Sequence, residues 1–95
     1  MIERHITFNV HTGRTADFER FIAESYGPAM AKSPGFVRLE LLREATDANR
    51  YQLTFRFRDA EAAAGWRTSP EHQALQSGLT ALFSTNEIVG YEVVA

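Results

Sequence analysis

Four segments of this chain alternate apolar and polar side chains at every second position, and helical segments separate the outer two from the inner pair. In the first segment, Ile6, Phe8 and Val10 point to one side of an extended strand, while polar residues point to the other. The predicted strands are Ile2–Thr12, Phe36–Glu44, Arg50–Arg58 and Asn86–Val94. This order predicts an α+β, ferredoxin-like βαββαβ fold, with helices on one face of an antiparallel four-stranded sheet.

Turn and capping residues set the expected limits of the first helix. Thr15 can act as its N-cap, and apolar residues then recur at helical spacing. Gly27-Pro28 should end or kink this helix, because proline lacks an N–H and clashes with the preceding turn. Ser33-Pro34-Gly35 then predicts a tight turn before the second strand.

A strong helix-start signal interrupts the second helical segment. Asp59 is expected to cap a short alanine-rich helix that leads to Trp66, and a further helix is expected over Pro70–Phe83. Two registers fit the cap of that further helix. Either Thr68 begins a capping box, or Ser69 caps a helix whose first residue is proline, and the residues alone leave both open.

The apolar rows of the four strands should face the helices and form the core. These rows are Ile6, Phe8 and Val10; Val37, Leu39 and Leu41; Leu53, Phe55 and Phe57; and Val89, Tyr91 and Val93. The opposite face then mixes apolar and polar groups without a single lysine: His5, Thr7, Asn9, His11, Phe36, Arg38, Glu40, Leu42, Gln52, Thr54, Arg56, Ile88 and Glu92. We infer that a second copy of the chain covers this face, which gives a homodimer joined through its sheets around a partly polar cavity.

Length and charge exclude several classes of protein. A length of 95 residues fits one domain over residues 1–95. The net charge of −2 argues against a nucleic-acid partner, and no apolar run approaches the ~20 residues of a membrane span. The absence of cysteine excludes disulfides, thiolate nucleophiles and zinc–cysteine sites, so a cytoplasmic location is expected.

The common catalytic motifs are missing. His5 and His11 share a strand face but lie about 20 Å apart at ~3.3 Å per residue, so they cannot bind one metal ion. No nucleophile elbow or glycine-rich phosphate loop is present. Arg38, Glu40 and Arg56 should cluster on the open face of the sheet, either as a structural ion pair or to recognise an anionic substrate oxygen.

His72 is the most suggestive single residue. At about 100° per residue it falls within the apolar stripe of its helix, which includes Leu75 and Leu79, and close to the only tryptophan, Trp66. One interpretation is a core histidine satisfied by a backbone carbonyl beside a core tryptophan. The other is a functional pair.

Several of these residues resemble a known family. Ser33-Pro34-Gly35-Phe36 entering a strand, Arg58-Asp59 before a helix, and above all the segment from Trp66 to Leu75 are similar to the antibiotic biosynthesis monooxygenase domain family. The resemblance implies a ferredoxin-like protomer that dimerises into an α/β barrel, with a cavity between sheet and helices. Some members oxidise polycyclic aromatic quinols or phenols with O2 and without metal or flavin, others degrade haem, and others are quinol monooxygenases.

The resemblance also implies roles for individual residues in such a cofactor-free oxidation. Trp66 would stack on the substrate ring, His72 would transfer a proton, and Asn9 would complete the catalytic group. The substrate would be bound by Arg56, Thr54, Arg38 and Tyr91. A small aromatic or quinol-type molecule is the expected substrate, and no cofactor is implied.

Two alternatives accompany this interpretation. The haem-degrading branch uses an asparagine on the first strand, a tryptophan on the second helix and a histidine further along it. Trp66 matches, but Asn9 lies toward the end of its strand and Gln76 stands where the ligating histidine would fall, which disfavours haem. The other alternative is a non-catalytic dimeric barrel that binds a small hydrophobic molecule. Whether the chain is an enzyme stays open at this level.

Overall fold

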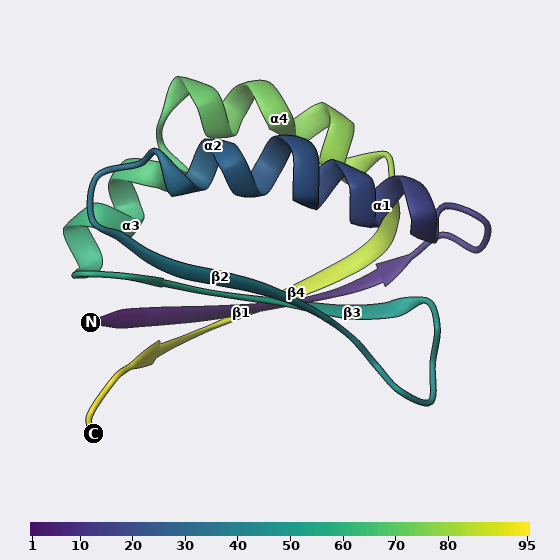
Figure 1. Ribbon diagram of the computed structural model, residues 1–95, viewed down its shortest axis with the longest axis horizontal. Coiled ribbons are helices and arrows are strands. Elements are labelled where there is room, and N and C mark those ends of the chain that lie inside the picture. Colours follow the sequence, from purple (N-terminus) through teal and green to yellow (C-terminus); the bar gives the residue numbers. More distant parts are fainter.

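A helical layer covers one face of a four-stranded antiparallel sheet (Figure 1). The computed structural model describes residues 1–95. The strands are hydrogen bonded in the order β2-β3-β1-β4, and they span Ile2–Val10 (β1), Phe36–Arg43 (β2), Arg50–Phe57 (β3) and Phe83–Glu92 (β4). The helical elements are α1 (Thr15–Phe21), the π-helical turn η1 (Ile22–Tyr26), α2 (Gly27–Ala31), α3 (Ala60–Arg67) and α4 (Pro70–Thr80). The ferredoxin-like βαββαβ prediction is confirmed.

The core lies between the two central strands and the helices. The predicted apolar rows of β1 and β3 face the helical layer, and Phe8 and Leu53 are completely buried there. From the helical side, Phe18 and Met30 are also completely buried. The prediction that alternating apolar residues build the core is therefore confirmed for the two central strands, β1 and β3. None of the helices combines the length and apolar character needed to cross a membrane.

The first helix runs past the predicted break. α1, η1 and α2 follow one another without interruption, and in η1 the Gly27 N–H donates to the Ile22 carbonyl five residues back. This wide turn brings Pro28 into the first turn of α2, where the missing N–H of proline is tolerated. The prediction that Gly27-Pro28 ends the helix is therefore wrong. Thr15 is the first helical residue rather than its cap, and Arg14 precedes it without a side-chain cap.

Gly27→Ala should destabilise the fold, whereas Gly65→Ala should stabilise it. A Cβ at Gly27 would lie 2.8 Å from the Ile22 carbonyl oxygen, so the helix backbone would have to move, at a cost of about 1–3 kcal/mol. A Cβ at Gly65 in α3 meets no heavy atom within 4 Å, so alanine there should gain up to ~1 kcal/mol of helix propensity. Urea unfolding of both variants measures this, and equal shifts of the same sign would contradict it.

The break between α3 and α4 resolves the two cap registers. Asp59 caps α3 as predicted, accepting a hydrogen bond from the Ala62 N–H at 2.8 Å. Ser69 is the N-cap of α4, and its hydroxyl accepts the His72 N–H at 3.1 Å. Thr68 instead donates to the Ala64 carbonyl as α3 ends. α4 stops at Thr80, three residues before the predicted end at position 83, because the chain turns there into β4.

The β2 strand contains a bulge that the alternating pattern hides. Phe36 is paired with Phe57, and the register shifts before Arg38 is paired with Arg56. Phe36 therefore packs against the core, and Val37 is 44% exposed. The assignment of Val37 to the core row and of Phe36 to the open face is wrong, because an extra residue in one strand reverses the alternation before it.

The β4 strand presents the opposite face from the one predicted. Val89 lies opposite His5 and Tyr91 opposite Glu3, so both side chains lie on the open face. Ile88 and Glu92 lie on the helix side, opposite Ile6 and Ile2, and Val93 follows the strand. The expectation that Val89 and Tyr91 meet the helices is therefore wrong. A register irregularity at Asn9/Val10 determines which residues of β4 face the helices. β4 is an edge strand, and the helices leave it largely exposed.

Candidate functional site

The predicted site residues fall on two sides of the sheet. Trp66 and His72 lie in the helical layer. The others, Asn9, Arg38, Thr54, Arg56 and Tyr91, lie on the open face by their strand registers. The protomer therefore does not bring Asn9 together with Trp66 and His72. Their joint catalytic role stays a prediction.

Trp66, His72 and Tyr26 form a compact aromatic group, here called the ring cluster. The Trp66 and His72 rings are 5.1 Å apart and nearly perpendicular, at 82°. Tyr26, from the π turn, packs edge-on against Trp66 at 5.6 Å and lies 6.1 Å from His72. Trp66 and Tyr26 are each only 2% exposed. The pairing of Trp66 with His72 inferred from their positions in the sequence is therefore present in three dimensions.

The surroundings of His72 favour its neutral form. Burial lowers its pKa, the nearby positive charge of Arg67 lowers it further, and a hydrogen bond with the Arg67 backbone partly opposes both effects. The Gln76 side-chain nitrogen lies 2.9 Å from His72 Nε2. Because that amide nitrogen can only donate, Nε2 is the acceptor. A neutral imidazole can accept a proton, but in this arrangement Gln76 occupies one of its nitrogens.

Trp66 carries an unsatisfied donor. Its indole Nε1 is shielded from solvent and has no hydrogen-bond partner. Burial raises the pKa of the neighbouring Tyr26 phenol, and a contact with the indole N–H that falls short of hydrogen-bond geometry partly opposes that rise. A buried donor without an acceptor costs about 1–3 kcal/mol, so the ring cluster keeps Trp66 in place through packing rather than hydrogen bonding.

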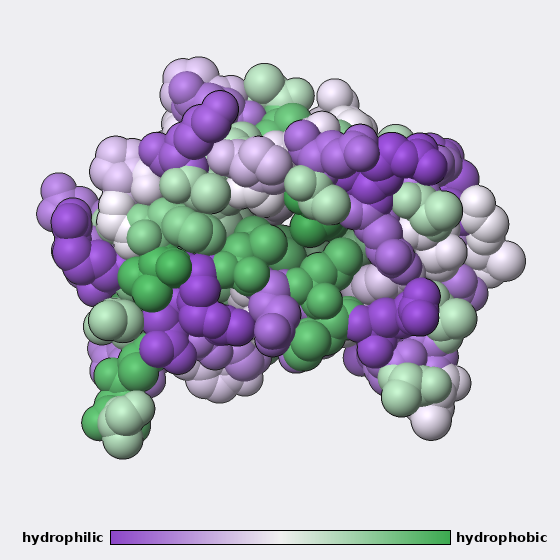
Figure 2. All heavy atoms as spheres, viewed as in Figure 1, coloured by the Kyte–Doolittle hydropathy of each residue, from purple (hydrophilic) through white to green (hydrophobic).

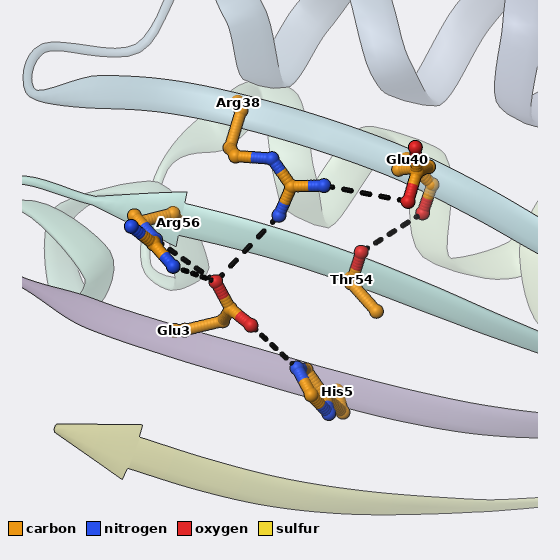
Figure 3. Close-up of polar contacts among 6 residues, drawn as sticks. All are labelled: Glu3, His5, Arg38, Glu40, Thr54 and Arg56. Atoms are coloured by element: carbon orange, nitrogen blue, oxygen red, sulfur yellow. Dashed lines mark hydrogen bonds and ion pairs between the residues drawn. The ribbon is translucent and has the colours of Figure 1, made fainter. Parts of the chain in front are cut away.

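The open face is organised by Glu3, a residue that the sequence analysis did not single out (Figure 3). One carboxylate oxygen accepts hydrogen bonds from Arg56 Nε at 2.8 Å and lies 2.7 Å from Arg56 Nη2. The other oxygen lies 2.7 Å from His5 Nε2. Arg38 Nη1 approaches the first oxygen at 3.6 Å. The available signal was the position of Glu3 two residues before His5, on the same strand face.

Arg38, Glu40 and Arg56 share the open face as predicted, but Glu3 is the carboxylate that lies close to both arginines. Arg38 also contacts Glu40 at 3.4 Å, and the Thr54 hydroxyl donates to the Glu40 backbone carbonyl at 3.5 Å. Every arginine on this face therefore has a carboxylate partner. These contacts fit the structural ion-pair interpretation of the cluster, since half-buried charges need partners.

Asn9 and Tyr91 lie at the β4 side of the open face. The Asn9 side chain donates to the Thr85 hydroxyl at 2.7 Å and accepts from Arg50 at 3.3 Å. The Tyr91 ring packs against His5 at 4.7 Å and is 48% exposed. Asn9 is thus committed to cross-strand contacts, whereas Tyr91 is open to a partner or ligand.

Glu3→Gln should lower stability at neutral pH and flatten the loss of stability on acidification. The hydrogen bond with His5, and then that with Arg56, hold the pKa of Glu3 below its usual value. The folded state therefore binds this proton less tightly than the unfolded chain does. Stability is fully present above the unfolded carboxyl pKa and is lost as pH falls through the folded one. Urea unfolding at fixed protein concentration over an acid pH series measures this. Glu24→Gln, at an exposed position without an ion pair, is the control, and identical slopes in both variants would contradict the expectation.

A groove between the helices and the edge strand β2 is the main apolar hollow, and Figure 2 shows apolar side chains gathered there. Its volume is about 520 Å³, within the ~300–1,000 Å³ of small-molecule sites. The apolar part of this β2 groove is lined by Ile22, Ala23, Pro28, Ala31, Phe36, Leu39 and Leu41. Glu19, Arg38 and Glu40 also line it. A cavity between sheet and helices was expected beside Trp66, but neither Trp66 nor His72 is among the residues that line this groove.

The π turn connects the two places. Ile22 at its start lines the β2 groove, and Tyr26 at its end belongs to the ring cluster. π turns inside helices are often associated with functional sites. No group of three or more histidine, aspartate or glutamate side chains is arranged to hold a metal ion.

Comparisons with known proteins identify the family. The antibiotic biosynthesis monooxygenase (ABM) family matches residues 1–78. SnoaB, a cofactor-independent oxygenase from Streptomyces nogalater, is 31% identical, with 99% of this chain and 93% of that chain covered and a TM-score of 0.89. Its N63A variant superposes equally well, with a TM-score of 0.88 at 30% identity over 97% of this chain and 91% of that one.

More distant structures share the fold. A Bordetella bronchiseptica protein assigned to the antibiotic biosynthesis monooxygenases is 22% identical, with a TM-score of 0.87 and coverage of 99% of this chain and 97% of that one. No curated protein sequence matches the chain significantly.

The fold and these matches define a small α+β protein of a monooxygenase family. The chain belongs to the antibiotic biosynthesis monooxygenase family.

Proposed function

We propose that this protein is a cofactor-independent monooxygenase that oxidises a small aromatic or quinol-type substrate with O2. The observation that carries the proposal is the β2 groove, an apolar hollow of about 520 Å³ between sheet and helices in a chain of this family. A flat aromatic ring fits such a volume, and apolar walls exclude the water that would compete for reactive oxygen species. The similarity to SnoaB, a cofactor-independent oxygenase, supports the same class of reaction.

The reaction balances without a further reductant when the substrate supplies the electrons. In an anthrone, loss of a proton gives an enolate that can pass one electron to O2. The carbon and reduced oxygen then combine, and cleavage of the O–O bond leaves one oxygen atom as the new carbonyl. The other oxygen leaves as water with the two hydrogens of the original CH2 group. The protein has to favour the anion, hold it beside O2 and stabilise the developing oxyanion.

His72 and Trp66 are the residues we propose for this chemistry. They do not line the β2 groove themselves, so a substrate bound there has to extend beyond the groove to reach them. Burial and Arg67 lower the pKa of His72, which favours the neutral form that a proton acceptor needs, and the Trp66 ring packs against the imidazole. Asn9, Arg38, Thr54, Arg56 and Tyr91 lie on the open face, so we assign them to a chamber that a second copy of the chain would enclose.

The homodimer itself is part of the proposal. The open face exposes apolar side chains that a monomer would leave in water: Leu42 is 44% exposed, Val89 42% and Tyr91 48%. Light scattering should give twice the 10.7 kDa mass of the chain, and Val89→Glu should shift the equilibrium toward monomer. A monomer at all concentrations would refute the proposed dimer. A cytoplasmic location also stays a prediction.

Oxygen uptake by metal-free protein tests the proposed activity. A panel of reduced naphthoquinones and anthrones should be consumed faster with the protein than in buffer, with one O2 per substrate. The product should be the quinone from an anthrone and a hydroxyquinone from a reduced naphthoquinone, with water as the second product. Heat-denatured protein controls for autoxidation. No acceleration across the panel would count against the enzyme.

One observation favours a second candidate, a dimeric barrel that binds a small hydrophobic ligand without turnover. Gln76 and the Arg67 backbone already hydrogen bond the His72 ring, and His72 is not among the groove-lining residues. In that case naphthoquinones should raise the melting temperature of the wild type and of His72→Ala equally, with no product formed. A haemin titration addresses the third alternative, because a shifted Soret band would indicate haem binding.

A further inference from the structure

The helical wall of the β2 groove carries one acidic side chain, Glu19. Along the first helix, Glu19, Ile22 and Ala23 follow one another at steps of three and four residues, so they share one helix face. All three line the groove. A carboxylate therefore lies beside the apolar side chains of this hollow, within reach of a molecule that fills it.

Two donors from the sheet hold the Glu19 carboxylate in place. The Tyr51 hydroxyl donates to Glu19 Oε2 at 2.5 Å, and Arg43 Nη1 donates to the same oxygen at 3.3 Å. Tyr51 is only 2% exposed. Burial raises the pKa of its phenol and the bond with Glu19 raises it further, so the phenol keeps its proton and stays the donor. Charge-assisted hydrogen bonds of this kind are strong, so Glu19 has a fixed position.

The second carboxylate oxygen of Glu19 is free. Both protein contacts go to Oε2, and Oε1 makes neither a hydrogen bond nor an ion pair. An ionised carboxylate can only accept hydrogen bonds. A ligand that places a hydroxyl here gains a hydrogen bond to a charged group, whereas a ligand with a carbonyl or ether oxygen brings two acceptors together.

The other carboxylate at the groove, Glu40, is placed differently. Glu40 is the β3 partner of Thr54 and shares the open face of the sheet with it. Its side chain contacts Arg38 at 3.4 Å on that face (Figure 3). Arg38, the remaining charged residue of the groove, also lies 3.6 Å from Glu3. Glu19 is therefore the acidic group on the helix side of the sheet, where the apolar walls are.

We propose that Glu19 determines the specificity of the β2 groove, and that it selects flat aromatic molecules with a free hydroxyl, phenols and quinols, over the corresponding ethers and quinones. This inference rests on the proposed use of the groove for an aromatic substrate and adds the residue that recognises the hydroxyl. In a quinol, oxidation converts the recognised hydroxyl into a carbonyl, which cannot donate. The product should therefore leave the groove more readily than the substrate.

Binding of 2-naphthol and of its methyl ether, 2-methoxynaphthalene, tests the proposal without turnover. Equilibrium dialysis with the protein in excess measures both ligands at low concentration. We expect the wild type to bind the naphthol about tenfold or more tightly than the ether, the usual effect of a hydrogen bond to a charged group.

Glu19→Gln should abolish this preference. Tyr51 and Arg43 both donate, so they should hold the amide oxygen at the place of Oε2 and turn the amide N–H toward the groove. The variant should then bind the ether at least as tightly as the naphthol. Glu40→Gln is the matched control, because it removes the same charge from the same groove and should keep the preference.

Three results would overturn the proposal. These are equal binding of naphthol and ether by the wild type, a preference that survives in Glu19→Gln, and a preference that Glu40→Gln also abolishes. If circular dichroism shows that Glu19→Gln does not fold, nuclear Overhauser effects in the wild type decide the question. The ring protons beside the naphthol hydroxyl should then be close to the Glu19 methylene protons, and contacts elsewhere on the protein would refute the assignment.

Oxygen uptake separates this inference from the proposed function. Selective binding of naphthol through Glu19 without any O2 uptake would support the specificity and refute the monooxygenase. O2 uptake with quinols by a protein that binds naphthol and ether equally would support the monooxygenase and refute the role of Glu19.

Discussion

Trp66→Ala should lower the free energy of unfolding by about 3–5 kcal/mol, the usual cost of removing a large buried aromatic side chain. Trp66 is 2% exposed and packs on both Tyr26 and His72, so its loss would leave a cavity at the junction of η1, α3 and α4. A domain of this size has a total stability of about 5–15 kcal/mol, so the variant should be close to unfolding. Urea unfolding followed by circular dichroism measures the effect without relying on the lost fluorophore.

Trp66→Phe is the informative partner of that variant. Phenylalanine keeps an aromatic ring against Tyr26, and no hydrogen bond is lost because the indole Nε1 has no acceptor. The phenylalanine variant should therefore be clearly more stable than the alanine variant. If both variants lose the same stability, the indole N–H has a partner that this structure does not show, and the packing account of the ring cluster is wrong.

His72→Ala should slow oxygen-dependent turnover by about 10²-fold or more, the usual contribution of a positioned proton acceptor. Because burial and Arg67 lower the pKa of His72, the wild-type rate should stay level on the acid side to a lower pH than an ordinary histidine would allow. Below that pH the imidazole becomes protonated and the rate should fall. Initial rates of O2 uptake against pH, with an anthrone as substrate, measure both effects.

His11→Ala is the matched control, because His11 is exposed at the end of β1 and makes no side-chain contact with the ring cluster. Its rate and pH profile should equal those of the wild type. If His72→Ala retains both the full rate and the acid limb, the proton acceptor lies elsewhere. The β2 groove, with Glu19 and Glu40 among its lining residues, then becomes the place to look.

The parts of the fold that could be predicted from the sequence are those in which a single local pattern determines the secondary structure and the buried face. β1 and β3 alternate strictly because both are central strands with one face on the core. Asp59 precedes an alanine-rich run and caps it. The Ser33-Pro34-Gly35 turn is also confirmed, with Gly35 at φ +81°, where glycine alone is unstrained.

The errors arise where one inserted residue changes the phase of everything beside it. A bulge at Val37 exchanges it with Phe36, and the irregularity near Asn9 decides which face Val89 and Tyr91 occupy. Hydrophobicity does not reveal these shifts, because both faces of β4 carry apolar residues. Similarly, Gly27-Pro28 predicts the end of a helix, because the sequence alone does not reveal that the Gly27 N–H donates to the carbonyl five residues back.

The contact between neighbouring residues of the candidate site could be predicted from the sequence, but the arrangement of these residues across the fold could not. Trp66 and His72 flank a helix break six residues apart, so their contact follows from the chain itself. A joint site would require the Asn9 side chain to lie on the helix side of β1, beside Trp66 and His72. The strand register places it on the open face instead. Glu3 was missed because its role depends on which charges lie near it in space.

The π turn at 22–26 allows the two halves of the first helix to be separated by one extra residue. Phe18 before it and Met30 after it are both completely buried. Ordinary α-helical winding of the same number of residues would rotate one half by about 100° relative to the other. Either Phe18 or Met30 would then leave the core, so a related sequence that lacks the π turn should be one residue shorter between these two buried positions.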